Sequence, residues 1–409
     1  MPALAGIQRR RCAWIRPRIG VRGKLSGRND EVNVVPAIYS VALVTLIVQG
    51  CHMGSRMVAS LFAIELGANP LLIGVLISAY SAFPLVLGVY SGRLSDRFGS
   101  RRPMLAGTAI LACGLILPFL WPWLAALYVS AVLIGIGFVF FNVSAQNLAG
   151  GLGAPEERTR NFSTLGLGYA GGHMLGPLVG GYAIDYYGFA AAYLCFAILI
   201  ALAVGLLAWN RRFDVAPRAA GVGRKSTLEL LHNAPLRRAI ITSGLVVTGW
   251  DLYSFYVPLY GHSIGLSAST IGVILGVFAV ATFVVRIVLP LFTRRYGVES
   301  VLSVAMFAGV VPFLLFPFIE FVPALLALSF GIGFALGCGQ PLTLNIAYNR
   351  SPPGRSGEVT GLRLTINNIT HIGVPLAAGA LGAALGVAPV FWASAAILAA
   401  SGRLSRAPR

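Results

Sequence analysis

Charged residues are scarce in this chain, and acidic residues are the scarcest. Only 11% of its 409 residues are charged and 57% are hydrophobic, whereas about a quarter of an ordinary soluble domain is charged. Lys and Arg number 31 against 13 Asp and Glu, which gives a formal net charge of +18. This composition excludes an ordinary water-soluble protein, and the meaning of the charge depends on where the basic residues lie.

The sequence also lacks the patterns of most enzymes and metal proteins. Its five cysteines include no close pair, and four of them lie in apolar segments, so no disulfide or zinc framework is implied. It contains no glycine-rich phosphate loop with its lysine, no metal-ligand cluster and no nucleophile elbow. We therefore expect neither an enzyme nor an ATP-driven pump, and no metal or cofactor.

Long apolar segments dominate what is present. A bilayer core of about 30 Å requires about 20 mostly apolar residues per helix, and twelve segments of about this length follow one another along the chain. We expect an all-α integral membrane protein with twelve transmembrane helices. The expected spans are 36–66, 70–90, 104–121, 124–150, 162–186, 189–210, 236–260, 270–292, 300–319, 322–348, 358–385 and 387–400.

The basic residues lie in alternate connections between these segments, and the opposite connections contain no Lys or Arg. This is the distribution of the positive-inside rule, and it differs from a nucleic-acid-binding face. We expect a protein of the plasma (inner) membrane with both termini cytoplasmic and no nucleic-acid partner. Residues 1–35 carry eight basic residues without the apolar core of a secretory signal, which predicts a cytoplasmic extension.

An internal repeat relates the two halves of the chain. A shift of 198 residues aligns Ile73-Gly74-Val75 with Ile271-Gly272-Val273, Arg97-Phe98-Gly99 with Arg295-Tyr296-Gly297, Asn147 with Asn345, His173 with His371, and Pro177 with Pro375. The expected organisation is an extension (1–35), a six-helix bundle (36–210), a cytoplasmic linker (211–235), a second bundle (236–402) and a tail (403–409). Parallel repeats of this kind place a binding site between the bundles near the membrane midplane.

The most specific motif lies between the second and third spans, and we call residues 92–102 the gating loop. It reads Gly92-Arg93-Leu94-Ser95-Asp96-Arg97-Phe98-Gly99-Ser100-Arg101-Arg102. This segment resembles the signature of the major facilitator superfamily, which implies two pseudo-symmetric six-helix bundles. In that family the loop stabilises the outward-facing state by pairing the halves, and the resemblance assigns this role to Gly92, Asp96, Arg97, Gly99, Arg101 and Arg102.

A solvated loop that only sets the topology is the alternative interpretation of this motif. The second copy has Arg294 where the first has Asp96, so we expect its latch to be weaker or absent.

The fifth span resembles the glycine-proline motif of the superfamily's antiporter branch. Its small residues favour close helix packing, with or without exchange chemistry. The branch also carries an arginine in the fourth span, where this sequence has Ala131, and this argues against the same proton relay. The motif residues are Gly172, Gly176, Pro177, Gly180 and Gly181.

Ionisable groups inside the bilayer are costly, and they are therefore candidate functional residues. The repeat shift puts Asp251 level with Met53, about one helical turn from Arg56. We expect Arg56 and Asp251 to pair, either around a charged substrate or a proton or as a static salt bridge. The other candidates in the spans are His52, Arg286 and Arg363 and the repeat-related His173 and His371, which either titrate in the cavity or bond backbone carbonyls.

Amides and aromatic rings complete the set of candidate site residues. The amides of Asn142, Gln146, Asn147, Gln340 and Asn345 bind substrate or join helices. Aromatic residues form an adaptable apolar pocket or face lipid: Trp250, Tyr253, Phe255, Tyr256, Phe138, Phe140 and Phe141.

The leading hypothesis for function is a secondary transporter that exports a small organic solute in exchange for protons and works as a monomer. Two alternatives stay open. One is a proton symporter that brings a metabolite inward, and the other is a membrane sensor or scaffold that does not transport and recruits partners or anionic lipid through its basic segments.

Overall fold

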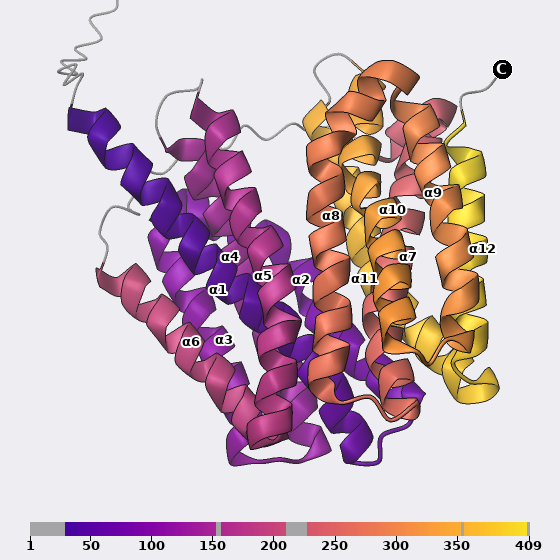
Figure 1. Cartoon of the computed structure of the whole chain (residues 1–409). Coiled ribbons are helices and arrows are strands. Elements are labelled where there is room, and N and C mark those ends of the chain that lie inside the picture. The colour runs from indigo at the N-terminus through magenta and orange to yellow at the C-terminus, as the bar shows by residue number, and fades with distance from the viewer. Residues whose placement is uncertain (1–28, 153–156, 210–226, 353–355, 407–409) are drawn as a thin grey trace, which may run out of the picture.

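A computed structural model describes residues 29–152, 157–209, 227–352 and 356–406 of the chain (Figure 1). Within these residues the protein is helical and contains no strand. Two short 3₁₀ helices, η3 (Thr227–His232) and η4 (Phe316–Phe318), accompany twelve long helices. The long helices are α1 (Asn29–Glu65), α2 (Pro70–Phe98), α3 (Arg101–Leu120), α4 (Leu124–Gly151), α5 (Arg158–Tyr187), α6 (Phe189–Trp209), α7 (Ala234–Ser263), α8 (Ala268–Tyr296), α9 (Val298–Leu315), α10 (Val322–Asn349), α11 (Ser356–Leu385) and α12 (Ala388–Leu404).

The twelve helices correspond to the twelve expected spans. In the described residues, nine are long and apolar enough to cross a membrane on their own, whereas α12 has 17 residues. The other two, α5 and α7, are less apolar. Helix α7 is mostly buried, and α5 packs closely against α1 and α8. Helix α1 begins at Asn29, inside the expected extension, and 1–28 and most of the expected linker lie outside the described residues.

The connections between helices repeat with the same 198-residue period as the sequence. Six glycines have positive φ, a conformation that side chains disfavour, and they fall into three pairs at this shift: Gly67 with Gly265, Gly99 with Gly297, and Gly188 with Gly386. Asn69 caps α2 by accepting from the amide of Leu72, and its repeat mate Ser267 caps α8 in the same way. The two halves therefore share their turns as well as their helices.

The halves meet at the end of the molecule opposite the start of α1 and the end of α12 (Figure 1). Gly74 of α2 lies against the carbonyl of Pro375 in α11, and its repeat mate Gly272 of α8 lies against the carbonyl of Pro177 in α5. A Cβ at either glycine would overlap that carbonyl oxygen. Two symmetric backbone contacts thus join the halves at this end, and in Figure 1 the halves diverge toward the end where α1 begins and α12 ends.

One carboxylate strengthens this junction across the halves. Asp185, near the end of α5, accepts from the backbone amides of Ala268 and Ser269 at 3.0 and 2.9 Å, at the start of α8. These amides have no partner within their own helix, and the positive end of the helix dipole favours a carboxylate. The repeat mate of Asp185 is Ala383, so this contact exists only once. Sequence analysis missed it because a carboxylate next to a turn carries no distinctive pattern.

The gating loop lies at the diverging end. Arg101 donates to the carbonyls of Leu207 and Ala208 at the end of α6, within its own half. Arg97 stacks over Phe98, as Arg295 stacks over Tyr296 in the second copy. The side chain of Asp96 is outside the described residues. The described contacts of the loop therefore stay within one half, and its pairing of the two halves remains a prediction.

The glycines of the α5 motif make close helix contacts. Gly172 and Gly176 lie against Gly50 and Gly54 of α1, and Gly181 lies against the carbonyl of Ala268 in α8. Side chains at these positions would separate the helices. In this structure the motif packs α5 against α1 and α6 of its own half and α8 of the other.

Candidate functional site

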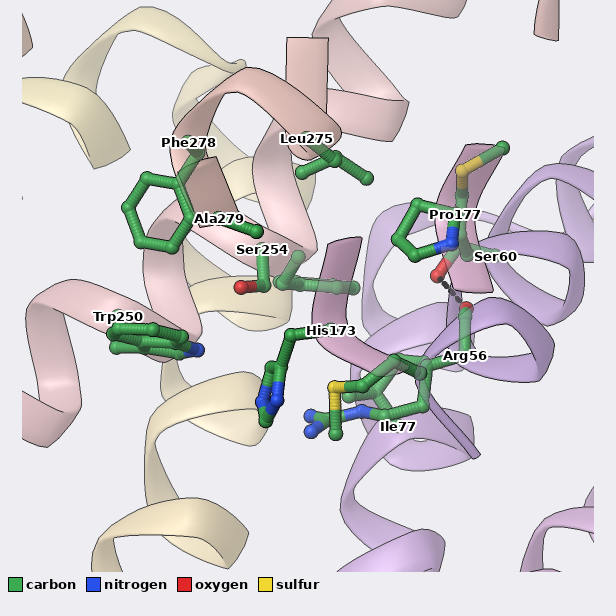
Figure 2. Close-up of a pocket in the computed structure, with 13 residues that line it drawn as sticks. Arg56, Ser60, Ile77, His173, Pro177, Trp250, Ser254, Leu275, Phe278 and Ala279 are labelled. Carbon is green, nitrogen blue, oxygen red and sulfur yellow. Dashed lines mark hydrogen bonds between the residues drawn. The ribbon is translucent and has the colours of Figure 1, made fainter. Parts of the chain in front are cut away.

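A cavity of about 50 Å³ lies between the two halves. Five helices line it: α1, α2, α5, α7 and α8. Its lining is mostly apolar, with a few polar groups, which is the usual character of a small-molecule site. The lining residues are Met53, Arg56, Met57, Ser60, Ile77, His173, Pro177, Trp250, Ser254, Phe255, Leu275, Phe278 and Ala279 (Figure 2).

The lining follows the internal repeat. Arg56 and Ser254 are repeat mates, as are Met57 and Phe255, and Ile77 and Leu275. Related positions of both halves thus face one space, as expected for a site on the axis between parallel repeats. Sequence analysis named Arg56, His173, Pro177, Trp250 and Phe255 and missed the others. The 198-residue shift, applied to every position near Arg56 and Asp251, would have identified more of the lining residues.

Arg56 carries the only charged side chain in the cavity lining. It comes from the middle of α1, and Figure 2 shows it on the same side of the cavity as His173. None of the described carboxylates forms an ion pair with it. The expected pair between Arg56 and Asp251 is therefore wrong for this structure.

Asp251 instead pairs with His371. The imidazole Nδ1 of His371 in α11 donates to Oδ2 of Asp251 in α7 at 2.6 Å. Asp251 is 1% exposed, whereas the side chain of His371 is 31% exposed. Sequence analysis selected both residues and assigned Asp251 the wrong partner, because the side-chain directions of α7 and α11 are set by packing and not by residue spacing.

The second repeat-related histidine, His173, has different partners. Its Nδ1 donates to the carbonyl of Tyr169 at 2.9 Å, and the amide of Gln49 donates to its Nε2 at 3.3 Å. Its ring meets Trp250 edge-on, with centroids 5.8 Å apart, across the boundary between the halves. Met53 occupies the repeat position of Asp251, so the first half provides no equivalent carboxylate. His173 thus bonds a backbone carbonyl, which is one of the two roles expected for these histidines. His371 bonds a carboxylate instead.

The structure places the candidate amides away from the cavity lining. Gln340 accepts from the guanidinium of the buried Arg363, and Asn142 accepts from the hydroxyl of Tyr169. Asn147 and Asn345 are exposed at the diverging ends of α4 and α10. Most of these amides join helices or are exposed at the diverging end, and none lines the cavity beside Arg56.

The aromatic residues divide into two groups. Trp250, Phe255 and Phe278 line the cavity, and the edge of Trp250 contacts Phe278 at 4.7 Å between centroids. Tyr253 and Tyr256 are buried behind them in the second half. Phe138 stacks on His52 at 4.0 Å inside the first half. The expected pocket therefore receives its aromatic surface from α7 and α8 and not from α4.

Curated relatives cover about half of the chain. The chain is 28% identical over 218 residues to the multidrug resistance protein MdtH of Yersinia enterocolitica, an alignment of 52% of each protein. The MdtH protein of Yersinia pestis strain Pestoides F is 27% identical over the same share. The aligned part of the chain thus spans about half the length of these relatives.

Solved structures show the same fold over almost the whole chain. A variant of the nucleoside transporter NupG gives a TM-score of 0.75 at 15% identity, covering 90% of this chain and 98% of that one. A bacterial homologue of the lysosomal transporter Spinster, in an inward-facing, unoccupied conformation, gives 0.73 at 14%, covering 91% and 96%. A peptide transporter, POT, in complex with sulfate gives 0.76 at 15%, covering 90% and 93%.

The sequence model of the Major Facilitator Superfamily matches residues 41–373. This match begins in α1 and ends in α11, and it includes the gating loop, the cavity lining and the Asp251–His371 pair. The chain belongs to the major facilitator superfamily and is a multi-pass membrane transporter.

Proposed function

We propose that this protein exports small amphipathic organic compounds in exchange for protons. The observation that carries the proposal is the Asp251–His371 pair, a buried carboxylate bonded to a partly exposed imidazole. Asp251 directly follows the cavity residue Trp250 in α7. Ionisable pairs at this depth in a transporter are characteristic of proton relays. The partly exposed imidazole gives a route by which a proton from outside the helix packing reaches the buried carboxylate.

The arrangement of the halves supports alternating access. The junctions of α2 with α11 and of α5 with α8 close one end, and the halves diverge at the other (Figure 1). The positive-inside distribution supports a cytoplasmic location for the diverging end in an inner-membrane protein, and this state would then be inward-facing. Rocking of the halves about the cavity would open the opposite end, and pairing by the gating loop would then hold the cytoplasmic end closed.

Efflux is favoured over uptake by the multidrug resistance names of the curated relatives and by the apolar lining. A cavity of methionine, leucine and aromatic side chains adapts to varied apolar molecules better than a fixed set of hydrogen bonds does. Because the cavity lies between two halves of one chain, a monomer provides the complete site.

Proteoliposomes with an imposed pH gradient test this function. A substrate would first be selected by thermal shift from cationic drugs, sugars, amino acids and organic acids. With the membrane potential clamped at zero, exchange predicts accumulation when the lumen is acidic, whereas symport predicts accumulation when the lumen is alkaline. A one-unit gradient supports up to about tenfold accumulation for each coupled proton, because one pH unit corresponds to a factor of ten.

Protein-free liposomes provide the control for passive partition of weak acids and bases. Accumulation only with an alkaline lumen would show that the protein is a symporter that takes up its substrate, and it would contradict the proposed export. Equal accumulation under both gradients would remove proton coupling from the proposal.

A further inference from the structure

Arg56 is unusual among the membrane-embedded charges of the described chain. Its neighbours in the cavity lining include Met53, Met57 and Ile77, and no described carboxylate pairs with it. A lone guanidinium in such surroundings is costly unless an anion meets it. By contrast, the buried Arg363 is held by Gln340 and Thr343 in its own half.

The one buried carboxylate near the cavity does not offset this charge. Asp251 is 1% exposed and directs an oxygen at His371 in α11. It is therefore screened from the space that Arg56 faces. A cationic ligand in the cavity would meet a guanidinium and find no accessible carboxylate among the lining residues.

A second guanidinium adds positive charge on the side of the cavity toward the diverging end. Arg286 lies on α8, two turns beyond the lining residue Phe278, which is about 12 Å along the helix. It is exposed. No described carboxylate forms an ion pair with Arg286. Arg286 therefore adds a second positive charge between the level of the cavity and the diverging end.

We propose that the ligand of the central cavity is an amphipathic organic anion whose charged head binds Arg56. A guanidinium matches a carboxylate, sulfonate or phosphate group with two parallel hydrogen bonds. The apolar body of the ligand lies against Trp250, Phe255 and Phe278, which face Arg56 from the other half. Arg286 attracts the ligand on the path to this site. This assignment of a substrate class rests on the proposed transport function.

Matched ligands of opposite charge test the assignment. The probes are 4-phenylbutyrate and 4-phenylbutylamine, together with the corresponding naphthyl pair, because each pair has one carbon skeleton and two head groups. Binding to the purified full-length protein at neutral pH is measured by titration calorimetry. The carboxylates should bind about tenfold or more tightly than the amines, because a charge-assisted bidentate contact is worth at least a factor of ten.

Three variants connect the preference to Arg56. Arg56→Gln should abolish the preference for carboxylates, and Arg56→Lys should retain part of it. Arg403→Gln, which removes an exposed arginine at the end of α12, should leave it unchanged. Thermal melting of each variant without ligand separates loss of binding from loss of folding.

The assignment would be overturned by equal or tighter binding of the amines, by absence of carboxylate binding, or by an unchanged preference in Arg56→Gln. None of these results would remove the proposed function, because gradient-driven flux of another solute is measured separately in proteoliposomes. Conversely, carboxylate binding without gradient-driven flux would retain the ligand class and remove proton-coupled transport.

Discussion

Replacing Asp251 by asparagine should eliminate proton-driven accumulation while preserving exchange of substrate across the membrane. Asparagine keeps the size of the side chain and an oxygen that accepts from His371, but it does not ionise near neutral pH. If the Asp251–His371 pair carries the coupled proton, a one-unit gradient that drives up to about tenfold accumulation in the unmodified protein should drive none in the variant. The measurement is substrate uptake into proteoliposomes with and without the gradient.

Glu299→Gln is the matched control for this variant. Glu299 is a carboxylate at the start of α9 that pairs with Arg350, away from the central cavity. The Glu299→Gln variant should retain full proton-driven accumulation of substrate. Accumulation that persists in Asp251→Asn at normal protein levels would show that Asp251 is a structural partner of His371 and not a proton carrier.

Valine at Gly74 or Gly272 should shift the protein toward the state in which the junction of the halves is open and the diverging end is closed. A Cβ at either position would overlap the carbonyl oxygen of Pro375 or Pro177 across the junction of the halves. Overpacking costs about 1–3 kcal/mol, which changes the ratio of two states by about 5- to 150-fold. Asp185→Asn should shift it in the same direction but by less, because it weakens a polar contact without a steric clash.

Distances between spin labels report this shift. One label pair replaces Phe98 and Tyr296 at the diverging end, and the other replaces Leu66 and Leu385 at the closed end, in a background without native cysteines. The first distance should shorten and the second should lengthen. Gly88→Val on α2 is the control, because a Cβ there meets no atom within 4 Å. Unchanged distances in Gly74→Val and Gly272→Val would show that these contacts do not hold the closed end.

The sequence predicted the fold because the bilayer imposes a simple length rule and the repeat is well preserved. The helix boundaries follow the apolar segments, and the turn glycines keep the 198-residue period, as Gly67 and Gly265 illustrate. Membrane insertion constrains each span separately, so hydropathy and the distribution of arginine are sufficient to predict the architecture.

The site was predicted only in part because its geometry depends on helix rotation. Sequence position determines the depth of Asp251 in the membrane but not the direction of its side chain. Arg56 lies at a suitable depth to pair with it, but the carboxylate accepts from His371. Asn147 and Asn345 match in the repeat, but they are exposed at the diverging end. A repeat preserves depth and direction in both copies, and it does not reveal whether that direction faces the cavity.

The central claim is that one cavity between the repeats is reached from one side of the membrane at a time. A cysteine in place of Ser254, a lining residue of α7, tests it most directly in a background without native cysteines. A membrane-impermeant thiol reagent should label this cysteine faster from the side where α1 begins and α12 ends. Adding Gly74→Val should raise labelling from the opposite side, relative to the first side, by about 5- to 150-fold. Labelling from both sides at equal rates, or a sidedness that Gly74→Val leaves unchanged, would contradict alternating access.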